Sequence, residues 1–271
     1  VVFNDKNELK PAVAEKWDIS PDGKVYTFYL RKGIKFHNGR ELTANDVQYS
    51  LDRAVLPATK SPTGPNYLLG VVGLTEVTSG KTNHLSGVKV LDPLTVQITL
   101  DKPRSYFLGT LAYISNVIVC KEAIEKRSSG IDPAGAIGSG PFKVQDFKPG
   151  GQLVLVANDS YRLGRPKLDR IERPIVINMQ TAHAKFEAGE VDEVDTAISD
   201  YKSDSKDAKL KDQVRVFTQA GTWYVGFQQR IQPIFKDVRV RRAIAMAIDK
   251  NEIVRISSGG AYPRADCFVP P

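Results

Sequence analysis

The sequence has few cysteines and no long apolar segment, and each shortage excludes a class of protein. Two cysteines, Cys120 and Cys267, occur in 271 residues, too few for the disulfide network that stabilises small secreted domains. No apolar run approaches the roughly 20 residues of a membrane-spanning helix, so we expect a chain that does not cross a bilayer. The apolar run 117–120 predicts a buried strand that ends in a free core thiol at Cys120.

The residue patterns of common metal and catalytic sites are also missing. His37, His84 and His183 lack the spacing of zinc motifs, and no cysteine pair is near them in the sequence. Ser139 stands between two glycines without completing a G-x-S-x-G motif, and Pro141 removes a donor that a phosphate loop would need. We therefore predict no metal, no cofactor and no catalytic residue, in a protein that is not an enzyme. A hydrolase that uses Ser139 or the histidines is the enzymatic alternative.

The charge is basic but spread along the chain. The sequence has 38 Lys and Arg against 31 Asp and Glu, a formal net charge of +7. Its densest basic cluster, residues 239–242, falls on an expected helix, and no basic and aromatic stripe indicates nucleic-acid binding. We interpret the excess as a solvated surface, which could face an anionic membrane, and predict no nucleic-acid partner.

The clearest local pattern covers residues 24–53. Alternating side chains predict a strand at 24–30, and a second extended piece at 34–36 is expected to form a hairpin with it. Thr43 and Asp46 form a variant of the capping box that starts a helix. Apolar residues at helical spacing follow, and Pro57 ends the helix.

Hairpins and amphipathic helices are predicted along the rest of the chain. Helices are expected at 179–188, where Gly189 is a natural stop, after Asp237, and after Asp249. The helix after Asp237 is expected to bury one apolar face. Further strands are expected at 88–90, 94–100, 142–147, 153–157, 175–178, 214–217 and 223–228.

The run around residues 24–53 closely resembles a signature of the family 5 extracellular solute-binding proteins. These are the peptide-, oligopeptide- and nickel-binding receptors of ABC importers. Later segments, at 138–142, 158–171, 182–192 and 233–249, are similar to further motifs of the same family. The residues that match the opening signature are Trp17, Ser20, Asp22, Gly23, Tyr26, Thr27, Phe28, Leu30, Arg31, Gly33, Lys35, Phe36, His37, Gly39, Thr43, Ala44, Asp46 and Val47.

The resemblance implies an α/β fold of the type II periplasmic-binding-protein-like class. It implies an inserted α/β subdomain of the first lobe at 1–137 and the central, ligand-bearing part of that lobe at 138–229. Residues 230–271 would leave the hinge and begin a truncated second lobe. The family's polypeptide extends beyond this segment, so we expect a fragment that is incomplete at both ends. Within it, His37 is expected to hold the turn of the opening signature together.

The resemblance also implies a function, the recognition of di- or oligopeptides in a cleft between two lobes. The expected partners are the peptide, an ABC permease and its ATPase. The expected ligand-binding residues are Trp223, Tyr224, Gln228 and Gln229, with Gln228-Gln229 where the family often has Phe-Asn or Asn-Asn. Aromatic and amide side chains suit a peptide backbone. A truncated interaction or sensor module without transport, and a binder of nickel chelates or glycans, are the alternatives.

An extracytoplasmic location follows from the same resemblance. The protein is expected in the periplasm or attached by lipid to the outer face of the cell membrane. Neither Cys120 nor Cys267 is near an N-terminus, so membrane association is expected only through an N-terminal anchor outside this segment. We expect residues 1–271 alone to bind ligand weakly or not at all, because half of the two-lobed structure that closes on the ligand is missing.

Overall fold

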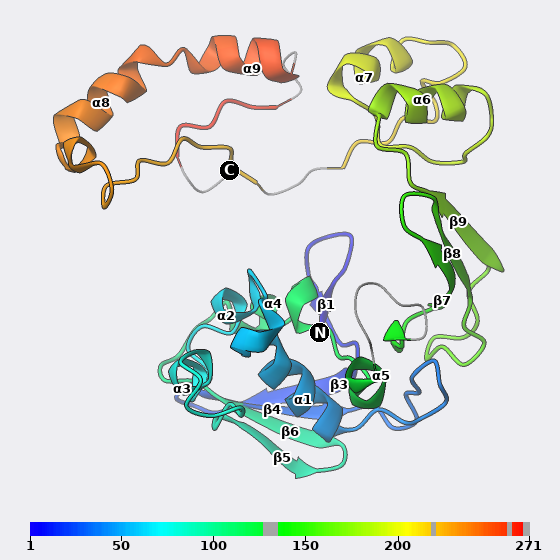
Figure 1. The fold of residues 1–271 in the computed structure, drawn as a ribbon, viewed down its shortest axis with the longest axis vertical. Coiled ribbons are helices and arrows are strands. Elements are labelled where there is room, and N and C mark those ends of the chain that lie inside the picture. The colour runs from blue at the N-terminus through cyan, green and yellow to red at the C-terminus, as the bar shows by residue number, and fades with distance from the viewer. Residues whose placement is uncertain (127–134, 218–220, 259–261, 268–271) are drawn as a thin grey trace. The chain divides into compact units, whose positions relative to one another are not determined.

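The structure, a computed structural model, describes residues 1–126, 135–217, 221–258 and 262–267 (Figure 1). The chain divides into two units, Val1–Ile175 and Val176–Pro271.

A four-stranded antiparallel sheet forms the base of the first unit, in the order β3-β4-β6-β5. Its strands are β3 (Ala14–Ile19), β4 (Val25–Leu30), β6 (Thr95–Thr99) and β5 (Val88–Asp92). The alternation in β4 buries every second side chain, those of Tyr26, Phe28 and Leu30. Tyr26 pairs with Ile98 and Phe28 with Val96 of β6, so the apolar residues of neighbouring strands share one face.

Helix α1 (Ala44–Val55) packs on this sheet (Figure 1), and its start is fixed by the predicted capping residues. The backbone N–H of Thr43 donates to the carboxylate of Asp46 at 2.9 Å, which satisfies one donor near the helix start. Arg40 binds the same carboxylate with both terminal nitrogens, at 2.9 and 2.6 Å. The helix ends before Pro57, as expected.

Short helical segments fill the loops around α1. The side chains that pack between them and the sheet include Phe36, Leu42, Leu68, Leu85 and Phe107, each at most 2% exposed. The segments are η1 (Pro57–Thr59), α2 (Gly64–Tyr67), α3 (Leu74–Thr78), α4 (Phe107–Thr110), η2 (Ile114–Asn116) and α5 (Lys121–Glu125), and a two-stranded ribbon of β1 (Val2–Phe3) and β2 (Leu9–Lys10) precedes the sheet.

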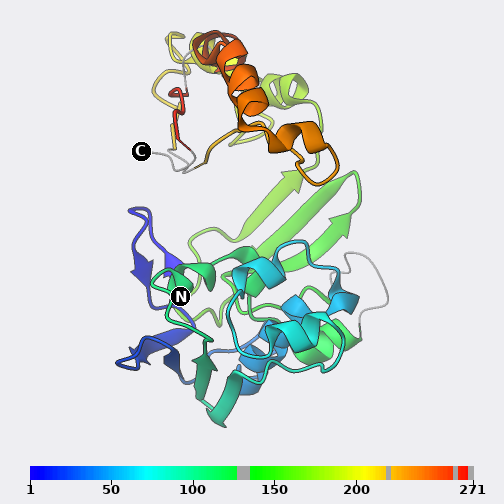
Figure 2. The same ribbon diagram turned by 90° about the vertical axis from the view of Figure 1, so that its left-hand side faces the viewer.

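A second antiparallel sheet completes the first unit, with its three strands side by side (Figure 2). It contains β7 (Phe142–Lys148), β8 (Gln152–Ala157) and β9 (Arg170–Pro174). The predicted hairpin at 142–157 is therefore confirmed. Val154 in the middle of β8 is 1% exposed.

The second unit is helical in its described part, which contains no strand. Asn178 caps α6 (Met179–Glu187) by accepting from Thr181 N–H, and Asp237 caps α8 (Val238–Ala247) by accepting from Arg239 N–H. Gly189 follows the first helix with φ +73°, the conformation that makes glycine a helix stop. The elements are α6 (Met179–Glu187), α7 (Ile198–Asp204), η4 (Pro233–Lys236), α8 (Val238–Ala247) and α9 (Lys250–Ser258).

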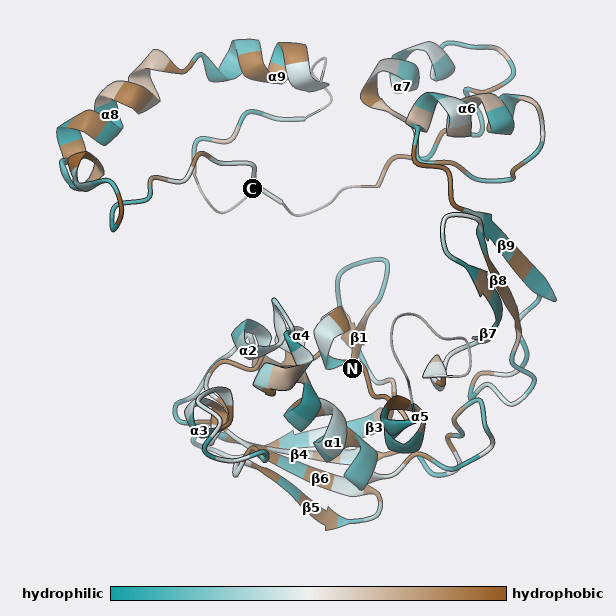
Figure 3. Cartoon of the chain, in the orientation of Figure 1, coloured by the Kyte–Doolittle hydropathy of each residue, from teal (hydrophilic) through white to brown (hydrophobic). Residues whose placement is uncertain are grey.

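Hydrophobic and hydrophilic residues are interspersed along α8 and α9 (Figure 3). The predicted apolar face of α8 is present in the sequence, but Val240, Ile244 and Ile248 are only half-buried and Ala243 and Ala247 are exposed. The expected burial of this face is therefore not observed. None of the helices in the described ranges is both long and apolar enough to cross a membrane.

The predicted hairpin between 24–30 and 34–36 is wrong. Both edges of β4 are already paired, one with β3 and the other with β6. Ile34 and Phe36 bond instead to residues 40–42 across a tight loop, through Leu42 N–H to Ile34 C=O and Phe36 N–H to Arg40 C=O, each 2.8 Å.

Two more expected strands do not form, for local reasons. The segment 117–120 bonds to helix α1 instead of a strand, with the N–H of Val119 donating to Ser50 Oγ at 2.9 Å. The segment 175–178 lies beyond the ladder of β9, which ends where its partner β8 begins at Gln152. The buried free thiol of Cys120 is confirmed, with 0% exposure.

The strands expected at 214–217 and 223–228 are also absent. A strand needs a partner for its backbone donors and acceptors, and the described part of the second unit offers none. Residues 214–217 and 221–228 therefore lie outside any strand ladder.

Candidate functional site

The four residues expected to bind ligand lie on one irregular segment of the second unit, 223–229. Trp223 is 92% exposed and Tyr224 is 69% exposed, while Gln228 and Gln229 are also exposed. Large aromatic side chains are costly to leave in water, so this exposure is typical of a binding surface. The four residues are brought together by their positions in the chain rather than by a cleft.

The end of this segment is fixed by local contacts. The N–H of Gln232 donates to the C=O of Gln228 at 3.0 Å, which closes a turn before η4. The ring of Phe227 packs on that of Phe235 with 5.2 Å between centroids and 54° between planes. Phe227 is half-buried, while the residues on either side of it are exposed.

An exposed aromatic surface in the first unit was not predicted from the sequence. Tyr67 stacks on Tyr113 with ring centroids 3.6 Å apart and planes within 6°, which joins α2 to the residue before η2. Burial, and then the contact with Tyr113, raises the pKa of Tyr67. Tyr106 at the start of α4 and Ile114 of η2 are 60% and 76% exposed, and the ring of Phe3 lies against Gly109 of α4.

We call these five side chains, from Phe3, Tyr67, Tyr106, Tyr113 and Ile114, the aromatic face. Their residues are scattered over more than a hundred positions and follow no helical or strand period. No sequence period could therefore reveal them. Three of the five are tyrosines, and this is the one sequence signal that they offer.

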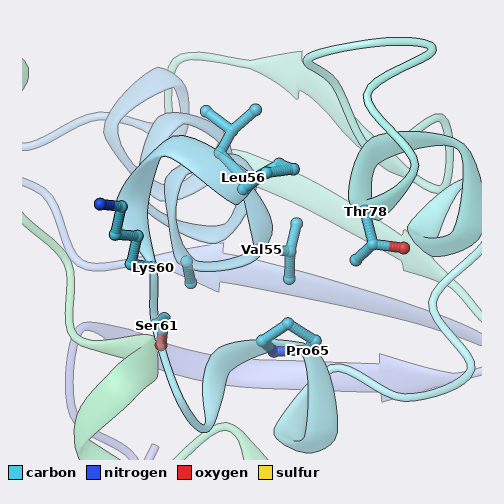
Figure 4. Close-up of a pocket in the computed structure, with 8 residues that line it drawn as sticks. Val55, Leu56, Lys60, Ser61, Pro65 and Thr78 are labelled. Carbon is cyan, nitrogen blue, oxygen red and sulfur yellow. The ribbon is translucent and has the colours of Figure 1, made fainter.

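Two small pockets open on the first unit. The pocket in Figure 4 has a volume of about 150 Å³ and is lined at the end of α1 by residues that include Val55, Lys60, Pro65 and Thr78. The second has a volume of about 270 Å³ and is lined by residues 69–76 with Asp101 and Arg104. Both are smaller than the roughly 300–1,000 Å³ of typical ligand sites. Neither includes the four expected ligand-binding residues, and neither is large enough to enclose an oligopeptide.

His37 holds two distant parts of the first unit together. Its Nδ1 accepts from the N–H of Gly138 at 3.2 Å, so its Nε2 carries the proton and donates to the C=O of Gly140 at 3.1 Å. Its own N–H donates to the C=O of Gly138. Burial lowers the pKa of His37, with a further contribution from the charge of Lys143. The structural role expected for His37 agrees with these contacts.

The three histidines occupy three separate places. His84 bonds to Asp52 at 2.8 Å beside α1, and His183 bonds to Asp204 at 3.0 Å between α6 and α7. Within the described ranges no group of three or more His, Cys, Asp or Glu side chains is arranged to hold a metal ion.

Comparison with known proteins agrees with this architecture. The structure of the Escherichia coli murein tripeptide binding protein MppA matches 99% of this chain with a TM-score of 0.86 and 29% identity, over 53% of its own length. Haemophilus influenzae OppA, solved in complex with RPPGFSPFR, matches 99% of this chain with a TM-score of 0.84 and 25% identity. The chain thus has the type II periplasmic-binding-protein-like α/β fold predicted from its sequence.

The match of the sequence to a family model identifies the family. Residues 8–271 match the model of bacterial extracellular solute-binding proteins, family 5 Middle, and the chain belongs to this family. It is 31% identical to the dipeptide-binding protein DppE of Bacillus subtilis, over 98% of this chain and 48% of DppE. It is 30% identical to the periplasmic oligopeptide-binding protein OppA of Escherichia coli, over 96% of this chain.

This membership confirms two expectations from the sequence, the family and the extracytoplasmic location. The chain spans about half the length of the curated relatives it matches. Family 5 consists of substrate-binding transport proteins.

Proposed function

We propose that this chain is part of the solute-recognition component of an ABC importer, which binds di- or oligopeptides and delivers them to a membrane permease. The observation that carries the proposal is the match of residues 8–271 to a family whose relatives are named for binding dipeptides and oligopeptides. The partners are the peptide, the permease and its ATPase. The protein acts without catalysis, and it contacts the membrane only through an N-terminal anchor outside this segment.

Within this proposal Trp223, Tyr224, Gln228 and Gln229 contact the peptide. The exposed rings of Trp223 and Tyr224 supply apolar area at low cost in side-chain entropy. The amides of Gln228 and Gln229 can both donate to and accept from a peptide backbone. Because 221–228 lies outside any strand ladder, its backbone can add to an extended peptide in the manner of a β-strand.

The proposal divides the chain as the sequence resemblance does. Residues 1–137 form an inserted subdomain, 138–229 the ligand-bearing lobe and 230–271 the start of the second lobe. The aromatic face of the first unit supports a ligand with apolar side chains, because Tyr106 and Ile114 are exposed there and apolar surface gains from being covered. Closure of two lobes on a ligand would be selected by contacts with both.

Calorimetric titration of the intact protein with a peptide library and a nickel–histidine complex tests the proposal. Peptide binding is expected, and the Trp223→Ala variant is expected to bind at least about tenfold more weakly, as aromatic hot spots do. The matched control Leu163→Ala removes a side chain that is 71% exposed and lies apart from residues 223–229 in the sequence, and it should bind as the unchanged protein does.

Three outcomes would contradict the proposal at different levels. Absence of heat with every solute would favour the interaction module over the transport protein. Unchanged affinity in Trp223→Ala would remove this segment from the site and leave peptide binding intact. Turnover of an ester or amide substrate that disappears in Ser139→Ala would show an enzyme.

A further inference from the structure

His183 and Asp204 form a largely buried side-chain pair in the second unit. His183 lies on α6, and its Nε2 is 3.0 Å from Oδ2 of Asp204, at the end of α7. Their side chains are 14% and 8% exposed. The pair joins two helices that are neighbours in Figure 1 and are separated in the chain by residues 188–197.

Carboxylates surround the His183 ring from both helices. Asp204 bonds to Nε2, while Oε2 of Glu187, one turn further along α6, is 3.7 Å from Nδ1. Asp200 of α7 also contributes its charge at the ring. The nearest lysine along α6, Lys185, is paired with Glu190. The imidazole therefore lies in a field of negative charge, which favours its protonated form.

Little apolar burial supports the contact of α6 with α7. In the described part of the second unit the buried residues are Asp204 and Ser258, and both are polar. A helix pair usually derives most of its stability from a buried apolar stripe. Where that stripe is missing, an ion pair that is shielded from water makes up a larger share of what holds the helices together.

We propose that His183 and Asp204 form a pH-sensitive latch, which holds α7 on α6 while His183 is protonated and loosens when the imidazole loses its proton. The bond between an imidazolium and a carboxylate is charge-assisted and stronger than the bond that a neutral imidazole makes. An extracytoplasmic protein is exposed to the pH of its surroundings, so the latch would respond to a change that it meets.

The direction of the response follows from the contacts. The bond to Asp204, then its charge and those of Glu187 and Asp200, raise the pKa of His183 above the ordinary value of about 6.5. A raised pKa contributes stability that is fully present below about pH 6.5 and is lost as the pH rises through the value in the folded protein. The latch is therefore closed in acid and loosens in alkali.

Hydrogen exchange on the intact protein tests this latch. The readout is the exchange of the backbone amides of α7, corrected for the intrinsic dependence of exchange on pH, between pH 5.5 and 9. We expect α7 to open several-fold more often at the alkaline end, with a midpoint that coincides with the titration of the His183 ring carbons measured by NMR. His183→Gln keeps a donor for Asp204 but does not titrate, so its α7 should lose this pH dependence.

A matched control and a second variant keep the test decisive. His84→Gln removes the other histidine that bonds to a carboxylate, in the first unit, and should leave the response of α7 unchanged. Asp204→Asn keeps an acceptor while removing the charge, and should lower the midpoint of His183 towards the ordinary value. The latch is overturned if His183 titrates at or below about 6.5, or if α7 opens with the same pH dependence in His183→Gln.

Discussion

The two units of this chain differ in what their interiors contain. The first unit holds every buried hydrophobic residue of the described chain, from Ala12 to Val154, and ion pairs with one buried partner, such as Arg40 with Asp46, are added to that core. The buried residues of the described second unit, Asp204 and Ser258, are both polar. Its large apolar side chains are half-buried or exposed, and the most exposed include Trp223 at 92% and Phe217 at 88%.

The first unit therefore contains the buried core that stabilises a fold, whereas the second unit presents mainly exposed side chains. Apolar burial is the main favourable term in folding, so most of the free energy that stabilises the first unit comes from its own buried core. The second unit is held by caps, turns and ion pairs, each of which contributes less. Its exposed aromatic residues are the ones proposed to meet a ligand.

The largest expected effect comes from removing a ring from the first core. Phe107 is 1% exposed and packs on Tyr26 with 4.9 Å between ring centroids, so Phe107→Ala should lower the free energy of unfolding by about 3–5 kcal/mol. Phe217→Ala in the second unit should change it by about 0.5 kcal/mol or less, because that ring is already in water. Urea denaturation of both variants measures the difference.

The two tryptophans allow each unit to be followed separately. Trp17 is in β3 of the first unit and Trp223 is in the second, and the sequence contains no other tryptophan. In a Trp223→Phe background the fluorescence reports on the first unit alone. Equal losses for Phe107→Ala and Phe217→Ala would contradict the comparison, because they would place a core around Phe217.

A smaller difference is expected between two aspartates at helix starts. Asp46 in the first unit is 4% exposed and receives Thr43 N–H and the guanidinium of Arg40, so Asp46→Ala should cost about 3 kcal/mol. Asp237 in the second unit caps α8 at the surface, and Asp237→Ala should cost about 1 kcal/mol.

Urea denaturation followed by Trp17 fluorescence measures the cost of Asp46→Ala, and denaturation followed by Trp223 fluorescence measures the cost of Asp237→Ala. If Arg40→Met in combination with Asp46→Ala restores part of the lost stability, the cost lies in the unpaired guanidinium rather than in the cap. A larger cost for Asp237→Ala than for Asp46→Ala would reverse the ranking of the two units.

Sequence reasoning succeeded where a feature depends on residues that are close in the chain. The alternation of β4, the capping contact of Thr43 with Asp46 and the stop at Gly189 are all confirmed, because each is decided by local backbone chemistry. The pairing of 34–36 with β4 was wrong, since a strand chooses its neighbour through the whole sheet and β3 and β6 already occupied both edges.

The site was accessible to sequence reasoning only through the family resemblance. That resemblance selected Trp223, Tyr224, Gln228 and Gln229, and their role stays a prediction. The aromatic face could not be predicted, because folding brings Tyr67 and Tyr113 into contact from positions 46 residues apart. The spacing of such residues contains no period from which a shared surface can be inferred.

The smallest expected effect is an opposite pH dependence of stability in the two units, caused by one histidine in each. Burial lowers the pKa of His37, so the stability that it contributes is fully present above about pH 6.5 and is lost as the pH falls towards the value in the folded protein. Protonation would place a second proton on Nδ1, where the ring now accepts from Gly138 N–H. The first unit should therefore weaken in acid, whereas the latch at His183 in the second unit weakens in alkali. Urea titrations between pH 5 and 8 with Trp17 as the reporter should show this loss in the unchanged protein and its absence in His37→Gln, and an acid loss of the same size in His37→Gln would assign it to other groups.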